Sequence, residues 1–344
     1  MTRRERLALG ALLYPGSRYA ALLAGLSDDF DLTRDTLPDA LRRILNEKWE
    51  SALSAARLIE EDCARSRVAY ILPGDALYPS ALFDLALPPL VLYAQGETAF
   101  LRQRGVTIVG TRRATWQGLA MAEHIARMAA REGYVVISGG AEGIDSAAHT
   151  GALAETGKTI AVLGGGLAGS APAHERILAQ GLLLSEFPPG VPARAFHFIR
   201  RNRILAALGR HLFVVQAPKK SGTMITVDWA LSLGRGITFC LWPPALKEAE
   251  GCRIFYKGVF HTADGTGFLK QEVRYRQFGD ILDELRCTAN MDERNILFAL
   301  LSGGRRLPEL VRASALPPER ALSALTRLEL QGRVASAGGR ICAV

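Results

Sequence analysis

A run of basic and aromatic residues near the middle of the chain has the composition of a surface that binds nucleic acid. Residues 194–203 contain four arginines and two phenylalanines. Arginines hold the phosphates of a single strand, and aromatic rings stack on its unpaired bases. The candidate contact residues of this run are Arg194, Phe198, Arg200, Arg201 and Arg203. Two alternatives stay open: Phe196 and Phe198 are residues of the hydrophobic core, and the arginines form a solvent-exposed face that binds no ligand.

Two further basic clusters stand directly after strand-like runs. Arg112 and Arg113 follow VTIVG and precede a helix predicted over Gln117–Arg131, and Lys219 and Lys220 follow HLFVVQA and open another helix. Free N–H groups at a helix N-terminus, together with cationic side chains, favour a phosphate. Ligands of open α/β sheets bind beyond the carboxyl ends of the strands. We therefore expect the clusters to converge at one edge of a sheet.

A glycine-rich turn supports a competing interpretation, a dinucleotide cofactor site. Gly164–Gly169 follows the strand-like TIAVL and fits G-x-G-x-x-G, and Glu186 ends the next strand about twenty residues on. Against it, this strand is not the first of the sheet, and Pro172 and His174 occupy the expected helix start. A nucleotide- or NAD-dependent enzyme that uses this turn is the alternative function. The preferred interpretation has no cofactor, no metal and no catalytic residue.

Hydrolase chemistry has little support in the sequence. Neither G-x-S-x-G nor H-E-x-x-H occurs. Ser138, Asp145 and His149 could supply a nucleophile and a base, but their spacing does not show that they meet. The spacing favours Asp145 as a cap of a helix that begins near Gly143, and His149 as a locally packed or hydrogen-bonded side chain.

The elements that must position the basic clusters follow an α/β pattern. From about Val68, short β-branched runs alternate with amphipathic stretches such as 119–131 and 171–180. Nearly continuous apolar strands separated by helices indicate a parallel sheet covered on both faces. The pattern predicts a doubly wound α/β domain over residues 68–285. The strand-like runs are VAYIL, PLVLYA, VTIVG, YVVISGG, TIAVLGGG, LLLSEF, HLFVVQA and ITFCLW.

Helical segments flank this core. Residues 1–67 carry apolar residues at helical spacing, including Leu22, Leu23 and Leu26 and a second stretch over 37–59. Residues 290–344 read as three helices, ERNILFALLS, LPELVRAS and PPERALSALTRLELQG, followed by the hairpin RVASAGGRICAV, which is the winged-helix layout. The stretch 246–280 fits no clear element.

The last predicted helix would be the recognition helix of a winged-helix module. It spans 317–331 and carries only Arg320 and Arg327 as basic residues. Such weak charge favours contact with protein over reading of the major groove, although duplex binding stays open.

The amino-acid composition limits the classes of function that the chain can have. The 344 residues include 42 Lys+Arg against 34 Asp+Glu, a net charge of +8 with an isoelectric point near 9.4, which favours an anionic partner. Apolar residues make up 49%, enough for a packed core. No apolar run approaches the roughly 20 residues that span a bilayer, so no membrane partner is expected. The five scattered cysteines form no C-x-x-C pair, which predicts a reducing, cytoplasmic location.

Several short motifs occur in a fixed order along most of the chain. They are Tyr78-Pro79-x-x-Leu82, Pro88-Pro89-Leu90-Val91-Leu92-Tyr93, Ile108-Val109-Gly110-Thr111-Arg112, Ser138-Gly139-Gly140-Ala141-Glu142-Gly143-Ile144-Asp145, Ser185-Glu186-Phe187-Pro188-Pro189-Gly190, Arg201-Asn202-Arg203-Ile204 and Ser221-Gly222-Thr223-Met224-Ile225-Thr226. Each alone is weak. As an ordered set they resemble the DNA-processing protein A family (DprA, also called Smf) of bacterial natural transformation.

The resemblance implies a protein without catalysis. Members bind single-stranded DNA on an extended Rossmann-like domain, form homodimers, and help load RecA recombinase while displacing single-strand-binding protein. A helical SAM-like module precedes that domain, and a winged-helix module follows it in many members. The resemblance further implies that Arg112 contacts phosphate, that Phe198 packs on a base and that Lys220 is the basic residue before S-G-[ST]. Arg201, Asn202 and Arg203 match the R-N-R run, where a structural role for Asn202 is also open.

The chain departs from the family pattern at three places. Glu142 stands where arginine is usual, which removes one positive charge. Residues 164–168 and 171–172 stand where G-T-G-L-D and a downstream Y-P are usual, so the resemblance assigns no DNA contact to that loop. The usual lysine near the aromatic is absent, and Arg194, offset by one position, is its candidate replacement.

Overall fold

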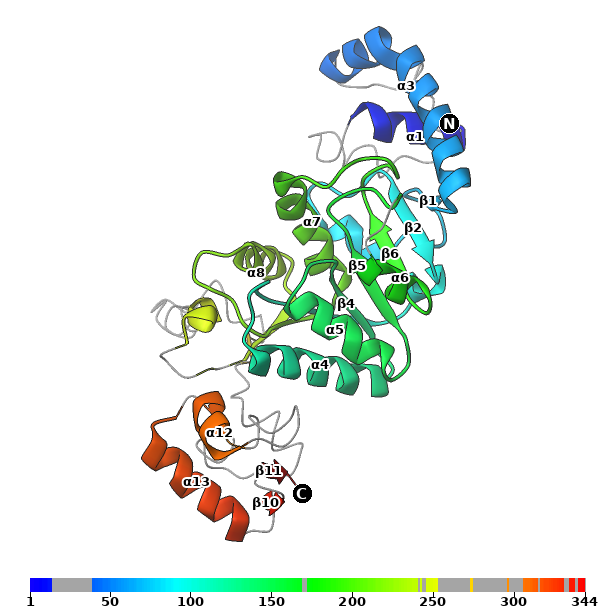
Figure 1. The fold of residues 1–344 in the computed structure, drawn as a ribbon. Coiled ribbons are helices and arrows are strands. Elements are labelled where there is room, and N and C mark those ends of the chain that lie inside the picture. Colours follow the sequence, from blue (N-terminus) through cyan, green and yellow to red (C-terminus); the bar gives the residue numbers. More distant parts are fainter. Residues whose placement is uncertain are drawn as a thin grey trace.

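A computed structural model gives the fold of the chain. It describes residues 1–13, 39–168, 172–240, 242, 246–252, 273–274, 296, 306–314, 316–330, 334–337 and 340–343. Three units follow one another along the sequence: an N-terminal helical unit, a central α/β unit and a C-terminal unit of helices and a hairpin (Figure 1). The predicted fold class is confirmed.

Within the described residues, nine strands form one sheet in the order β1-β2-β6-β5-β4-β3-β7-β8-β9. From β6 to β9 all neighbours are parallel. The strands are β1 (Ala69–Ile71), β2 (Leu92–Gly96), β3 (Gly105–Val109), β4 (Val135–Gly139), β5 (Thr159–Val162), β6 (Leu182–Ser185), β7 (His211–Val214), β8 (Gly236–Phe239) and β9 (Val273–Arg274).

One edge of the sheet differs from the prediction of an all-parallel sheet. Strand β1 pairs antiparallel with β2, with Ile71 opposite Leu92, and β2 pairs antiparallel with β6. The connection from β1 to β2 contains only the short 3-10 helix η1 (Ser80–Asp84). A parallel pair needs a crossover, usually a longer helix, so this short connection favours an antiparallel edge.

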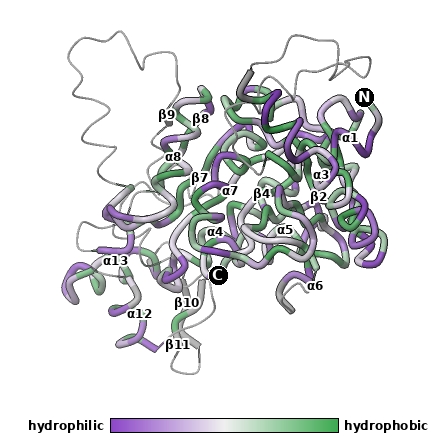
Figure 2. Tube along the Cα trace, turned by 90° about the horizontal axis from the view of Figure 1, so that it is seen from above, coloured by the Kyte–Doolittle hydropathy of each residue, from purple (hydrophilic) through white to green (hydrophobic). Residues whose placement is uncertain are grey.

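Helices cover both faces of the sheet. Helices α4 (Trp116–Arg131) and α5 (Ile144–Leu153) pack on one face, whereas α7 (Ala195–Leu208) and α8 (Gly222–Ser232) pack on the other. The short helix α6 (Pro172–Leu178) lies beside β5 and β6, and η2 (Thr98–Arg102) precedes β3. Figure 2 shows the hydrophobic residues concentrated in the central strands.

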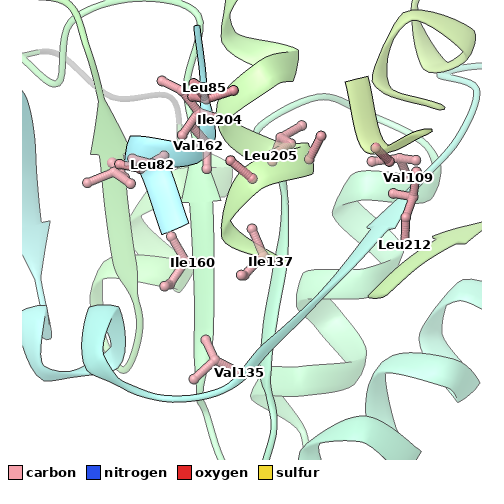
Figure 3. Close-up of a cluster of buried hydrophobic side chains, with 14 of the residues drawn as sticks. Leu82, Leu85, Val109, Val135, Ile137, Ile160, Val162, Ile204, Leu205 and Leu212 are labelled. Carbon is pink, nitrogen blue, oxygen red and sulfur yellow. The ribbon is translucent and has the colours of Figure 1, made fainter. Parts of the chain in front are cut away.

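Alternation along each strand sends apolar side chains to both layers. On β4, Val135 and Ile137 belong to the cluster with α7, while Val136 belongs to the cluster with α4 and α5. Figure 3 shows Val135 and Ile137 on the side of Ile204 and Leu205 of α7. Burial on two faces explains why these strands read as continuous apolar runs.

The N-terminal unit consists of α1 (Arg3–Leu12) and α3 (Asp39–Ser66). Thr2 begins α1 with a capping box, because its hydroxyl accepts from the Glu5 amide while the Glu5 carboxylate accepts from the Thr2 amide. Both helices share an apolar cluster with Tyr93 and Leu183 of the sheet, so the unit packs on the core. The predicted helical residues Leu22, Leu23 and Leu26 lie outside the described residues.

The C-terminal unit contains α12 (Leu307–Ser314), α13 (Pro318–Leu330) and the antiparallel pair β10 (Val334–Ala337) and β11 (Arg340–Ala343). These confirm two predicted helices and the hairpin strands. The predicted first helix lies outside the described residues except for residue 296. Of the stretch 246–280, the structure describes η3 (Lys247–Ala249), its neighbours and β9. No helix of the described chain is both long and apolar enough to cross a membrane.

Candidate nucleic-acid interface

A cleft of about 370 Å³ lies at the carboxyl ends of β3 and β7, and we call it the carboxyl-edge cleft. Four segments that are distant in sequence line it: residues 109–113, Ala141 and Asp145 around the start of α5, the middle of α7, and the start of α8 with the residues before it. The sequence-predicted residues that the structure brings together here are Arg112, Arg113, Phe198, Arg201, Asn202 and Lys220. Strand β3 pairs directly with β7, which explains why the loops after these two strands meet.

A buried glutamine fixes the loop that carries Arg112 and Arg113. The backbone carbonyl of Gln216 accepts from the Thr111 amide at 2.7 Å, and its side-chain oxygen accepts from the Thr115 amide at 3.0 Å. The Gln216 amide nitrogen in turn donates to the Thr115 hydroxyl at 2.8 Å. Both arginines are exposed on this fixed loop, so their positions are set before any ligand binds.

Gly143 allows the start of helix α5 to pack closely against the same loop. Its φ of +81° lies in the region that favours glycine, and a Cβ there would meet the carbonyl oxygens of Thr111 and Arg112. The Ile144 amide donates to the Thr111 carbonyl at 3.3 Å. The start of α5 therefore holds Arg112 at the mouth of the cleft.

The Phe198 ring forms part of the cleft wall between two arginines. The Arg112 guanidinium lies 4.9 Å from the ring centroid, and that of Arg201 lies 5.9 Å away. Phe198 is half-buried, while Phe196 is 49% exposed. Neither phenylalanine belongs to the buried core, so the core interpretation of these residues is wrong.

Arg201 is a buried charge beneath the cleft. Its Nη1 donates to the Val162 carbonyl at 2.6 Å at the end of β5. The guanidinium and the Asp145 carboxylate both lie against Gly139, where a Cβ would collide with each. Burial lowers the pKa of Arg201, and the nearby Asp145 carboxylate partly offsets that shift. Burial likewise raises the pKa of Asp145, and the Arg201 guanidinium acts in the opposite direction.

The Ser138, Asp145 and His149 arrangement is not a nucleophile with its base. The Ser138 hydroxyl donates to the Ile108 carbonyl at 2.6 Å. His149 uses both ring nitrogens, one with the Thr159 hydroxyl at 2.7 Å and one with the Gly139 carbonyl at 3.0 Å. Burial lowers the pKa of His149 to about 4, so its imidazole is neutral and structural at pH 7. The local hydrogen-bonding role expected for His149 is confirmed, whereas the N-cap of α5 is Gly143.

Asn202 and Lys220 define the α8 side of the cleft. The Asn202 side-chain nitrogen donates to the Gly222 carbonyl at 3.0 Å, which ties α7 to the first residue of α8. Lys219 and Lys220 are exposed immediately before α8, but only Lys220 lines the cleft. Among the described residues, the buried hydroxyl of Ser221 beside Lys220 has no hydrogen-bond partner.

Arg203 lies outside the cleft, in contrast to its place among the sequence candidates. Its guanidinium forms two hydrogen bonds with Glu186, at 2.8 and 2.7 Å, and its Nε donates to the Leu87 carbonyl at 3.1 Å. The Arg203 and Glu186 side chains are 3% and 1% exposed. Arg203 thus forms a buried ion pair that joins α7 to the residue after β6, and its guanidinium cannot reach a ligand on the surface. Arg194, which precedes α7, and Arg200 do not line the cleft either.

The glycine-rich turn does not offer a dinucleotide site. The Gly166 amide donates to the Val191 carbonyl at 2.7 Å, and the Ala168 amide donates to the Pro189 carbonyl at 2.9 Å. The amides that would bind a pyrophosphate are therefore occupied by the loop after β6. Gly169, the last residue of the motif, lies outside the described residues. This hydrogen bonding contradicts the structural basis of the alternative function.

Sequence reasoning missed Gln216 and the charge of Asp145 as parts of the site. A glutamine that closes the apolar run HLFVVQA and is fully buried signals a polar group with a fixed partner. Asp145 is likewise a buried acid, and a buried acid needs a nearby counter-charge. Both residues act on the site through its shape and electrostatics.

The fold and the cleft define an α/β protein with a cationic groove at the carboxyl edge of its sheet and a winged-helix unit. Residues 69–260 match the sequence family described as DNA recombination-mediator protein A, and residues 285–340 match the DprA winged helix domain. The chain therefore belongs to the DNA recombination-mediator protein A family.

Individual relatives agree with this assignment. The chain is 37% identical over 201 residues to Protein Smf of Synechocystis sp., which is 56% of this chain and 50% of that protein. The match thus spans about half the length of that relative. The structure resembles DNA processing protein A from Streptococcus pneumoniae with a TM-score of 0.62 and 28% identity, over 75% of this chain and 93% of the other. It also resembles DNA processing protein A from Helicobacter pylori, a structure described for its single-stranded DNA binding mode, with a TM-score of 0.53 and 28% identity, over 64% of this chain and 96% of the other.

Proposed function

We propose that the chain binds single-stranded DNA in the carboxyl-edge cleft and carries out no chemical step. The observation that carries the proposal is the convergence of Arg112, Arg113 and Lys220, three exposed cations, on one cleft that the half-buried ring of Phe198 also lines. Cations beside an aromatic platform suit a strand whose bases are unpaired. The relative from Helicobacter pylori, whose published description concerns single-stranded DNA binding, supports the same function.

Each group of the cleft has its own part in the proposed binding. Arg112, Arg113 and Lys220 neutralise phosphates, and the Ser221 hydroxyl is a further donor at the start of α8. The Arg112 guanidinium lies over the Phe198 ring, 4.9 Å from its centroid. When its guanidinium turns to a phosphate, a base takes its place on the ring, so binding exchanges one cation–π contact for stacking and a charge-assisted hydrogen bond.

A single strand fits this site better than a duplex. Phe198 can stack only on a base that is not paired within a helix. The winged-helix unit adds little charge for duplex reading, because α13 carries Arg320 and Arg327 as its basic residues. We therefore assign the main DNA contact to the α/β unit and a protein contact to the winged-helix unit.

The wider role rests on the family. We propose that the chain acts in the cytoplasm as a homodimer during natural transformation and recombination, helps load RecA recombinase onto single-stranded DNA and displaces single-strand-binding protein. The proposed modules are residues 1–67, 68–285 and 290–344. The family matches at 69–260 and 285–340 support this division.

The test is a salt titration of the full chain with single- and double-stranded oligonucleotides. Tight binding of the single strand should fall steeply with salt, because each phosphate contact contributes about 0.7 to the slope of log K against log salt. Arg112→Ala should lower that slope by about 0.7 for every base sequence. Arg57→Ala is the matched control, because Arg57 is an exposed arginine of α3 that does not line the cleft. Equal slopes for the wild type and Arg112→Ala would contradict the phosphate role.

A further inference from the structure

A second and larger cleft lies at the opposite edge of the sheet. It has a volume of about 830 Å³ and lies at the amino ends of β3 and β8, beside η1 and the end of α7, and we call it the amino-edge cleft. The large apolar lining side chains that are only partly buried are Leu77, Phe100 and Leu208, so the Phe100 ring is an aromatic surface that a ligand can reach. Ligand sites are typically about 300–1,000 Å³, so this cleft has the size of one, and polar groups make up much of its surface.

Arginines surround this apolar surface. Arg102, Arg104 and Arg210 line the cleft and are exposed, and in the described part of the chain none of them has a carboxylate partner. Arg235 also lines it and pairs with Asp84 at 2.7 Å, and Asp84 is the acidic residue of the lining. The cleft therefore has a surplus of three positive charges.

Such a surplus is unfavourable without an anion nearby. Guanidiniums that line one cleft repel each other, and they are the side chains that best match the geometry of phosphate. The charge is also concentrated over low-dielectric walls, which strengthens the local field. The cleft is thus arranged to attract an anionic ligand.

We propose that the amino-edge cleft binds a nucleoside phosphate, with the base on the apolar and aromatic lining and the phosphates on Arg102, Arg104 and Arg210. A nucleoside phosphate joins a flat base to several negative charges, so it can contact both the apolar residues and the arginines of the lining. An acidic peptide would use only the arginines. The exposed ring of Phe83 in η1, 5.1 Å from the ring of Tyr78, offers further stacking surface beside the cleft. This site is separate from the carboxyl-edge cleft and goes beyond the proposed function.

The nucleoside phosphate could be a free nucleotide or one unit of a DNA strand, and calorimetry separates the two sources. The full chain is titrated with dATP, with uncharged deoxyadenosine, with inorganic tripolyphosphate, and with an oligothymidine of about 20 nucleotides, longer than the site of one such domain. The double variant Arg104→Ala/Arg210→Ala removes two exposed side chains, so its fold should be preserved, and circular dichroism checks this. Arg57→Ala is the control for loss of an exposed arginine, and Arg112→Ala reports on the other cleft.

With a free nucleotide as the ligand, dATP binds more tightly than either of its parts. The double variant then weakens dATP binding by about tenfold for each guanidinium removed, as charge-assisted contacts are the strong class. Arg112→Ala and Arg57→Ala leave dATP binding unchanged. With a DNA unit as the ligand, dATP does not bind, but the oligonucleotide shows a second binding event that the double variant abolishes and Arg112→Ala retains. The proposal is overturned if neither ligand depends on Arg104 and Arg210, if tripolyphosphate binds as tightly as dATP, or if Arg112→Ala removes the dATP site.

Discussion

The buried pair of Arg203 and Glu186 allows a direct test of whether Arg203 of the R-N-R run stabilises the fold or contacts a phosphate. The two parallel hydrogen bonds of 2.8 and 2.7 Å satisfy both carboxylate oxygens, and the Arg203 Nε has its own acceptor in the Leu87 carbonyl. With side chains 3% and 1% exposed, neither charge can be solvated if its partner is removed. Arg203→Met and Glu186→Gln each break the pair from one side.

The expected magnitude follows from this burial. Removing one member of a buried ion pair costs about 3–5 kcal/mol, since the other charge stays buried without compensation. That is a large part of the roughly 5–15 kcal/mol by which a typical domain is stable. Changing both residues together leaves two neutral side chains, so the double variant should lose much less than the sum of the single variants. The double-mutant cycle should therefore show a coupling of several kcal/mol.

Urea unfolding followed by tryptophan fluorescence measures the stability of the four proteins of this cycle. Oligonucleotide titrations at several salt concentrations, made well below the unfolding transition, measure phosphate contacts. Arg203→Met should lower the unfolding midpoint and leave the salt slope unchanged. A variant that keeps full stability while its salt slope falls by about 0.7 would refute the reasoning, as Arg203 would then contact a phosphate.

Three further changes probe the carboxyl-edge cleft and its support. Glu142→Arg is at an exposed position beside Ala141 of the lining. It should strengthen single-strand binding and steepen its salt dependence, measured by fluorescence anisotropy, whereas weaker binding would contradict the placement of the strand in this cleft. Gly139→Ala places a methyl group against Arg201 and Asp145 and should cost about 1–3 kcal/mol of stability in urea, whereas no cost would show that the pair can move aside. The His149 pKa of about 4 lies below that of an unfolded histidine, about 6.5, so the unfolded state takes up the proton first as the pH falls. Stability should drop by about 3 kcal/mol from pH 6.5 to 4 in denaturant titrations, and a slope that persists unchanged in His149→Gln would assign the effect to other groups.

The sequence predicted most of the α/β unit because its strands carry a strong signal. Strands β3 and β4 are buried along their whole length, so each reads as a nearly continuous apolar run, with Thr107 in β3 and Ser138 in β4 as its polar residues. The convergence of Arg112 with Lys220 also followed from the rule that ligands bind beyond the carboxyl ends of strands. The rule does not give strand order, however. That β3 lies next to β7 depends on packing of distant segments, and only the structure shows it.

The error over Arg203 has a clear geometric cause. Residues of a helix are separated by about 100° around its axis, so Phe198 and Arg201 share a face, whereas Arg203 lies about 200° beyond Arg201. Counting arginines in the run 194–203 treated all of them as one surface. Glu186 could have signalled the partner, because an acid directly after a buried strand needs a counter-charge. The sequence does not show, however, that the partner of Glu186 is on α7, because that pairing depends on α7 packing beside β6.

The R-N-R run joins α7 to three different elements, and this explains how residues without ligand contact can control the cleft. Arg201 binds the end of β5, Asn202 binds the start of α8, and Arg203 binds the residue that follows β6. Two walls of the cleft, Phe198 on α7 and Lys220 before α8, are thereby held at a fixed separation. Strand affinity must depend on that separation, because a phosphate and its base have to reach both walls at once. Substitutions in the run should therefore weaken DNA binding by moving Phe198 relative to Lys220, without removing a phosphate contact at Arg203.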